Sequence, residues 1–254
     1  MTTSVAVGLS GDSGWILTAA TLVVAGLLLV PGWIVGRSAR LAALPSLAVA
    51  PALSSAIIAA AEILAHTLAL PWLPWGWAVI AGLTAILVLM ARLIVGAPPE
   101  RARRAASQGR AEWVILAAGL TVAVAVPAGV ILSVLPGPGY PAQVFDATFH
   151  LNAVAAIREG GNASMLGGLS ALYSGRAVYY PTVWHGAVAL APGSPAPVST
   201  AGVLALTAVV WPLSLLGLFA RATGLDATRA SETDRVHRRQ RTCAVAAVLA
   251  LSAA

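Results

Sequence analysis

One short segment combines the side chains best suited to acid–base chemistry. Asp146 and His150 lie four residues apart in VFDATFHLNAVAAIREGG, a stretch whose pattern predicts a helix that stops at the pair Gly160 and Gly161. Residues four apart share one face of a helix, so the carboxylate and the imidazole are within reach of each other. Such a pair suits a general base whose proton is managed by its neighbour, or two ligands for a divalent cation.

A second histidine, His185, follows in the motif YYPTVWH, and Arg176 lies in the loop between. A zinc site of Asp146, His150 and His185 is one alternative, although the spacing matches no established ligand motif. In the other alternative, Asp146 caps or solvates an interfacial helix and both histidines lie at the level of the lipid headgroups. The residue types alone leave both alternatives open.

Glu62 and His66 form another pair with a spacing of four, inside a long apolar run. Ionisable groups at membrane depth are costly and therefore suggest a function, here a proton relay or a substrate contact. The alternative is a mutually satisfied pair that faces the interior of a helix bundle, with His66 near the wet end of its helix.

The composition decides what kind of protein must position these groups. The chain has 254 residues, of which 59% are hydrophobic and 9% charged, and its mean hydropathy is +0.86. Soluble domains carry roughly 25% charged residues, so a soluble enzyme, a disordered tail and a disulfide scaffold are excluded. A spanning helix needs about 20 apolar residues. We therefore expect an all-α, polytopic membrane protein with five to six transmembrane helices.

Apolar runs and turn signals predict the order of these elements. Five runs are long enough to span a bilayer, at 14–35, 41–70, 78–95, 113–135 and 198–220. The segment PWLPWGW at 71–77 is expected to be a short outer turn whose tryptophans anchor at the interface. The last run, 242–254, is too short to cross, which predicts the N-terminal part of a longer protein. Three regions follow: a four-span bundle (1–135), a polar loop with the candidate site (136–197) and a C-terminal segment (198–254).

The charge distribution predicts the orientation. All fifteen basic residues are arginines, and thirteen of them fall in alternate connections between the apolar runs. This positive-inside pattern places those connections in the cytoplasm, and the N-terminus and loop 136–197 outside the cytoplasmic membrane of a bacterium. No arginine-rich face with aromatic residues is visible, so the expected partner is the lipid bilayer and not a nucleic acid.

The motif order in the polar loop resembles a known family. Asp-x-x-x-His, a helix ending in Glu-Gly, a loop of small residues and Tyr-Tyr-Pro-x-x-x-His before a span are similar to the first outer loop of the GT-C glycosyltransferases. More narrowly, FDATFHLNAVAAIREGGNAS with YYPTVWHGAVAL resembles an actinobacterial multi-pass family of unknown function. The similarity covers about a third of the chain, from Phe145 to Gly224.

The GT-C resemblance implies a membrane enzyme that transfers sugar from a polyprenyl-phosphate donor to a glycan acceptor during cell-envelope synthesis. Its catalytic acid would fall on Asp146, which deprotonates the acceptor or helps to hold a divalent cation. His150 and His185 would support it at the same mouth, where the motif also places Tyr180. Our own addition is Arg176, whose guanidinium suits a phosphate. Two rival functions remain: a transporter or flippase with Glu62 and His66 as its polar core, and a non-catalytic envelope-assembly protein.

Overall fold

The computed structural model describes residues 11–96, 110–137, 140, 145–222 and 232–252. Within these ranges every regular element is helical, and five segments are long and apolar enough to cross a membrane. They are Gly14–Ser38, Ala43–Thr67, Trp72–Val95, Val114–Val134 and Pro195–Ala222. The prediction of an all-α polytopic membrane protein is confirmed. Residues 97–109, between the third and fourth apolar runs, and residues 138–139 and 141–144 of the predicted polar loop lie outside the described residues.

The first two helices, α1 (Gly11–Ser38) and α2 (Ala43–Thr67), pack closely because small residues line their contact. A Cβ atom on Gly32 would lie 2.2 Å from the carbonyl oxygen of Ala50, and the Gly32 N–H donates to Ser54 Oγ at 2.9 Å. In a membrane such close approach, together with interhelical hydrogen bonds, drives helix association. The next span, α3 (Trp72–Val95), touches both helices, but most of its apolar surface stays exposed.

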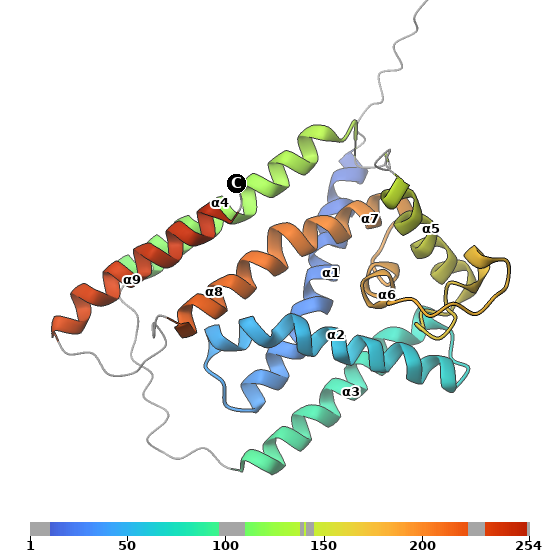
Figure 1. Cartoon of the computed structure of the whole chain (residues 1–254), viewed down its shortest axis with the longest axis horizontal. Coiled ribbons are helices and arrows are strands. Elements are labelled where there is room, and N and C mark those ends of the chain that lie inside the picture. The colour runs from blue at the N-terminus through green and yellow to red at the C-terminus, as the bar shows by residue number, and fades with distance from the viewer. Residues whose placement is uncertain (1–10, 97–109, 138–139, 141–144, 223–231, 253–254) are drawn as a thin grey trace, which may run out of the picture.

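A second pair of helices lies beside this group. In Figure 1, α4 (Arg110–Val134) and α9 (Glu232–Leu251) run side by side. Gly119 makes this possible, since a Cβ atom there would lie 2.8 Å from the Cα atom of Ala246. The last apolar run begins at residue 242, whereas α9 already begins at Glu232. Helical backbone therefore extends from the apolar run into the charged residues before it.

The last span is built from three helical pieces in direct succession. These are α7 (Pro195–Leu204), a π-helical turn η3 (Ala205–Val210) and α8 (Trp211–Ala222). Between α4 and this span lie α5 (Phe145–Gly160), a short 3₁₀ turn η2 (Ser170–Tyr173) and the seven-residue helix α6 (Val183–Ala189). The predicted end of α5 is confirmed, since Gly161 follows it with a left-handed φ of +67° that glycine adopts without strain.

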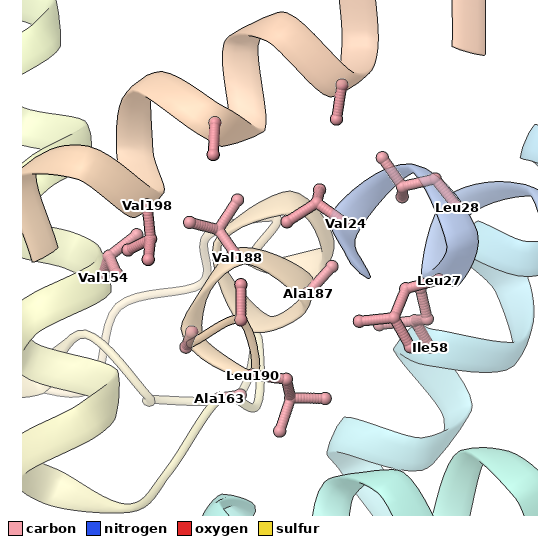
Figure 2. Packing of buried hydrophobic residues seen from close by; sticks show 14 of the residues in the cluster. Val24, Leu27, Leu28, Ile58, Val154, Ala163, Ala187, Val188, Leu190 and Val198 are labelled. Carbon is pink, nitrogen blue, oxygen red and sulfur yellow. The ribbon is translucent and has the colours of Figure 1, made fainter. Parts of the chain in front are cut away.

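Helix α6 is buried inside the bundle although it is too short to span it. Ala187 and Val188 have no exposed surface and pack among apolar side chains of α1, α2, α5 and α7. Figure 2 shows Val188 between Val154, Val198 and Val24. Burial on all sides explains why the segment TVWHGAVALA is uniformly apolar around one histidine.

The prediction that residues 71–77 form an outer turn with interfacial tryptophans was wrong for Trp72. Helix α3 begins at Trp72, and this side chain is only 1% exposed. Its indole Nε1 donates to the carbonyl oxygen of Gly186 in α6 at 2.9 Å. Trp75 and Trp77 are exposed, as expected for interface anchors. Trp72 is therefore a buried side chain whose hydrogen bond holds α6 against α3.

Candidate functional site

The structure brings His150 and His185 into direct contact. Nδ1 of His150 on α5 and Nε2 of His185 on α6 lie 2.8 Å apart, which is a hydrogen-bond distance. His150 is half-buried and His185 is only 3% exposed. The two residues are 35 positions apart in the sequence, so only the packing of α5 against α6 creates the pair.

Aromatic rings surround His185. Its ring centroid lies 5.0 Å from that of Trp184, 5.7 Å from that of Tyr180 and 6.4 Å from that of Phe149, all in edge-to-face geometry. This arrangement directs the positive edge of one ring at the negative face of another. Tyr180, expected at the mouth of the site, is thus in contact with the histidine pair.

The packing around His185 controls its charge. Burial is the larger cause and the neighbouring His150 the smaller one, and together they lower the pKa of His185 from 6.5 to about 4. His185 is therefore neutral at physiological pH. Its Nδ1 atom is buried and, within the described residues, has no hydrogen-bond partner.

A pocket opens beside His150. It has a volume of about 180 Å³ and lies between α5, α6 and α7. Its walls are formed by Ala147, His150, Leu151, Trp184, Ala196, Ser199, Thr200 and Val203. The wall includes an imidazole, an indole and two hydroxyl groups, but no Asp, Glu, Lys or Arg. The pocket can therefore accept a polar group without supplying a formal charge.

Asp146 and Arg176 lie at the margin of this cluster. Asp146 is exposed in the first turn of α5, where a carboxylate is favoured by the positive end of the helix dipole. It lies one turn before His150, but Nδ1 of that histidine is bonded to His185. Arg176 is exposed in the loop after η2. The site is therefore centred on the two histidines, with the predicted acid and the predicted phosphate partner at its edge.

The structure also bears on the zinc hypothesis. Two of its three ligands, His150 and His185, do meet, but across a hydrogen bond that contains a proton. Among the described residues no group of three or more His, Cys, Asp or Glu side chains could hold a metal ion. A protein-bound zinc needs three or four such ligands, so the described side chains do not complete that site.

Glu62 and His66 do not form the pair that their spacing suggests. Glu62 is 1% exposed, and its Oε2 accepts a hydrogen bond of 3.0 Å from the hydroxyl of Thr182. His66 is exposed and instead lines a separate cavity of about 230 Å³ with Asn162 and Gly161. The physical reason is that Thr182, directly before α6, is a partner 120 residues away that helical periodicity cannot reveal.

The second carboxylate oxygen of Glu62 packs against α6 without a hydrogen bond. Among the described residues, Oε1 is buried and has no partner. A Cβ atom on Gly186 would lie only 1.9 Å from it, so a larger residue at this position would force the Glu62 carboxylate to move. Glu62 therefore holds the beginning of α6, close to His185, from the α2 side.

Arg158 secures the other end of α6, a role that we did not predict. Its Nε donates to the carbonyl oxygen of Ala189 at 3.0 Å, and its two terminal nitrogens donate to the carbonyl oxygens of Ala191 and Gly193. These carbonyls follow a helix C-terminus, where a cation is favoured. The available signal was that Arg158 is one of only two arginines outside the arginine-rich connections between the apolar runs.

Comparison with known families identifies the family of this chain. A model of a family of unknown function, DUF6541, matches residues 25–254. The chain belongs to the DUF6541 family. This confirms the expected relationship to a family of unknown function. No curated protein and no solved structure matches this DUF6541 member at a significant level.

Proposed function

We propose that this DUF6541 chain is a GT-C-like membrane glycosyltransferase that uses a polyprenyl-phosphate-linked sugar outside an actinobacterial cytoplasmic membrane. The observation that carries the proposal is the hydrogen-bonded pair of His150 and His185, held among aromatic rings one helical turn after an exposed carboxylate. The five candidate spans supply the bilayer setting that a lipid-linked substrate needs.

Each group has a task in this proposal. Asp146 removes the proton from the acceptor hydroxyl, because a carboxylate at an exposed helix start is accessible to an incoming glycan. His150 provides a hydrogen-bond partner for the substrate beside it. Arg176, exposed on the neighbouring loop, pairs with the phosphate of the donor, a role that a divalent cation could share.

The test is the replacement Asp146→Asn in the full-length protein. A general base contributes on the order of 10²–10⁴ in rate, so we expect glycosyl transfer in isolated membranes to fall at least about a hundredfold. Glu159→Gln is the matched control, because Glu159 is an exposed carboxylate at the other end of the same helix. Thermal stability measured for both variants verifies folding. Undiminished transfer by the Asp146→Asn protein would remove the proposed base.

A transporter or flippase remains a second candidate, and the buried Glu62 favours it. A carboxylate with one unpartnered oxygen inside a candidate span is the kind of group that binds a transported cation or proton. This function predicts that Glu62→Gln abolishes substrate movement in proteoliposomes, while Asp146→Asn does not. The glycosyltransferase proposal predicts the opposite ranking for sugar transfer.

A further inference from the structure

The hydrogen bond between the histidines determines where their protons are. In a hydrogen bond between two imidazole nitrogens, one ring must donate and the other accept. If His150 donated through Nδ1, His185 would carry its proton on its own Nδ1. That atom is buried without a partner among the described residues. A buried N–H without an acceptor costs about 1–3 kcal/mol, and orphaned N–H groups are rarer than under-satisfied acceptors.

The arrangement of lower free energy has the hydrogen bond between the two histidines in the opposite direction. His185 then donates through Nε2–H to Nδ1 of His150, and the buried Nδ1 of His185 is a bare lone pair. The depressed pKa of His185, about 4, agrees with a ring that stays neutral. The proton of His150 must then reside on its Nε2, on the side of the ring away from Nδ1.

His150 lines the 180 Å³ pocket, whereas His185 does not. The bond to His185 uses Nδ1 of His150, so the ring edge that carries Nε2 is the one available to a ligand in the pocket. Ser199 Oγ, another wall group, is buried and has no hydrogen-bond partner among the described residues. The Trp184 indole N–H is already used by the carbonyl oxygen of Gly202 at 3.4 Å, so this residue offers its ring surface. The pocket thus contains unused hydrogen-bonding capacity.

The residue types in the pocket walls limit the chemical class of ligand that the pocket can bind. None of the described wall residues is an Asp, Glu, Lys or Arg. A phosphate or carboxylate in this pocket would lose its hydration without a counter-charge, which is expensive. A neutral group with hydroxyls can instead satisfy the imidazole and the two hydroxyl side chains and pack against an indole.

We propose that this pocket binds an uncharged, hydroxyl-bearing ring through the Nε2–H of His150, and that His185 is the positioning residue that fixes His150 in this tautomer. The assignment of the ring as the sugar of the substrate rests on the proposed function. The tautomer and the pocket do not, because they follow from the contacts of the free protein.

The first experiment measures the tautomer directly. The full chain, labelled with ¹⁵N-histidine and embedded in lipid nanodiscs, contains four histidines that single substitutions can assign. At pH 7.5 we expect a pyridine-type Nδ1 and a pyrrole-type Nε2 for His150. His185→Gln keeps a donor and should preserve this pattern, whereas His185→Phe should give a mixture of tautomers. His66→Gln is the control, because His66 is exposed in a different cavity and should leave the His150 signals unchanged.

Two results would overturn the positioning role. One is a proton on Nδ1 of His150 in the native protein. The other is an unchanged His150 tautomer in a folded His185→Phe protein. If that variant does not fold, the native spectrum and the Gln variant still decide the question.

The second experiment tests the ligand class in the same nanodiscs, without glycoside detergents. Methyl glycosides of glucose, galactose, mannose and arabinose are titrated, with inorganic phosphate as the charged comparison. We expect at least one glycoside to shift the His150 Nε2–H resonance, and Thr200→Val to weaken that binding about tenfold. A shift by phosphate alone, or by no glycoside, would refute the neutral ligand. Neither readout requires transfer activity, so a negative Asp146→Asn test would leave this result standing.

Discussion

We expect acid to lower the unfolding free energy of this protein through the buried imidazole of His185. Burial and the neighbouring His150 lower the pKa of His185 from 6.5 to about 4, so the folded protein resists the proton that the unfolded chain accepts. The stabilisation by a neutral His185 is complete above pH 6.5 and is lost as the pH falls toward 4. At roughly 1.4 kcal/mol for each pKa unit, the two values differ by about 3 kcal/mol of unfolding free energy.

Chemical or thermal unfolding of the full chain in nanodiscs between pH 7.5 and 4 would measure this loss. Carboxylates titrate in the same range, so the comparison must be with His185→Gln, which retains a donor for Nδ1 of His150 but does not titrate. We expect the native protein to lose about 3 kcal/mol more than this variant over that range. His66→Gln, at an exposed histidine, should follow the native curve.

The reasoning would be refuted by parallel pH curves for the native protein and His185→Gln. Such a result would mean that water reaches His185 or that an acceptor compensates its charge. The rings of Phe149, Tyr180 and Trp184 that pack around it would then not exclude solvent as their geometry implies.

Further predictions concern how α6 is held. Gly186→Ala forces a methyl group against Glu62 and should cost about 1–3 kcal/mol in unfolding experiments, while Gly160→Ala, with open space around it, should cost nothing. Arg158→Lys loses the fork that reaches three carbonyls and should lower stability by about 2 kcal/mol, with faster amide exchange in the residues that follow α6. Trp72→Phe leaves a buried carbonyl unpaired and should cost about 1–2 kcal/mol by the same unfolding measurement.

Local features of the sequence determined much of the fold. Apolar runs of sufficient length predicted the five candidate spans, and the glycine pair predicted the end of α5. These succeed because bilayer thickness and helix capping act on residues that are neighbours in the chain.

Tertiary packing contradicts two predictions that were based on local sequence patterns. The tryptophan-rich segment at 71–77 suggested an interfacial turn, but Trp72 is buried because α6 offers it a carbonyl acceptor. The i and i+4 spacing of Glu62 and His66 suggested a pair, but Thr182 binds Glu62 instead. In both cases the partner that forms the hydrogen bond lies in α6 or directly before it. No local pattern in the sequence connects this segment to α2 or α3.

The site itself was decided only by tertiary structure. The sequence named His150 and His185 as candidates, but placed the emphasis on the pair of Asp146 and His150 because they share a helix face. The bond that forms joins side chains 35 residues apart, and the pocket beside it draws its walls from three helices. Periodicity determines which face of a helix is apolar, whereas the choice of contact between distant helices depends on how their side chains interlock. That interlocking is a property of the assembled bundle and not of any one segment.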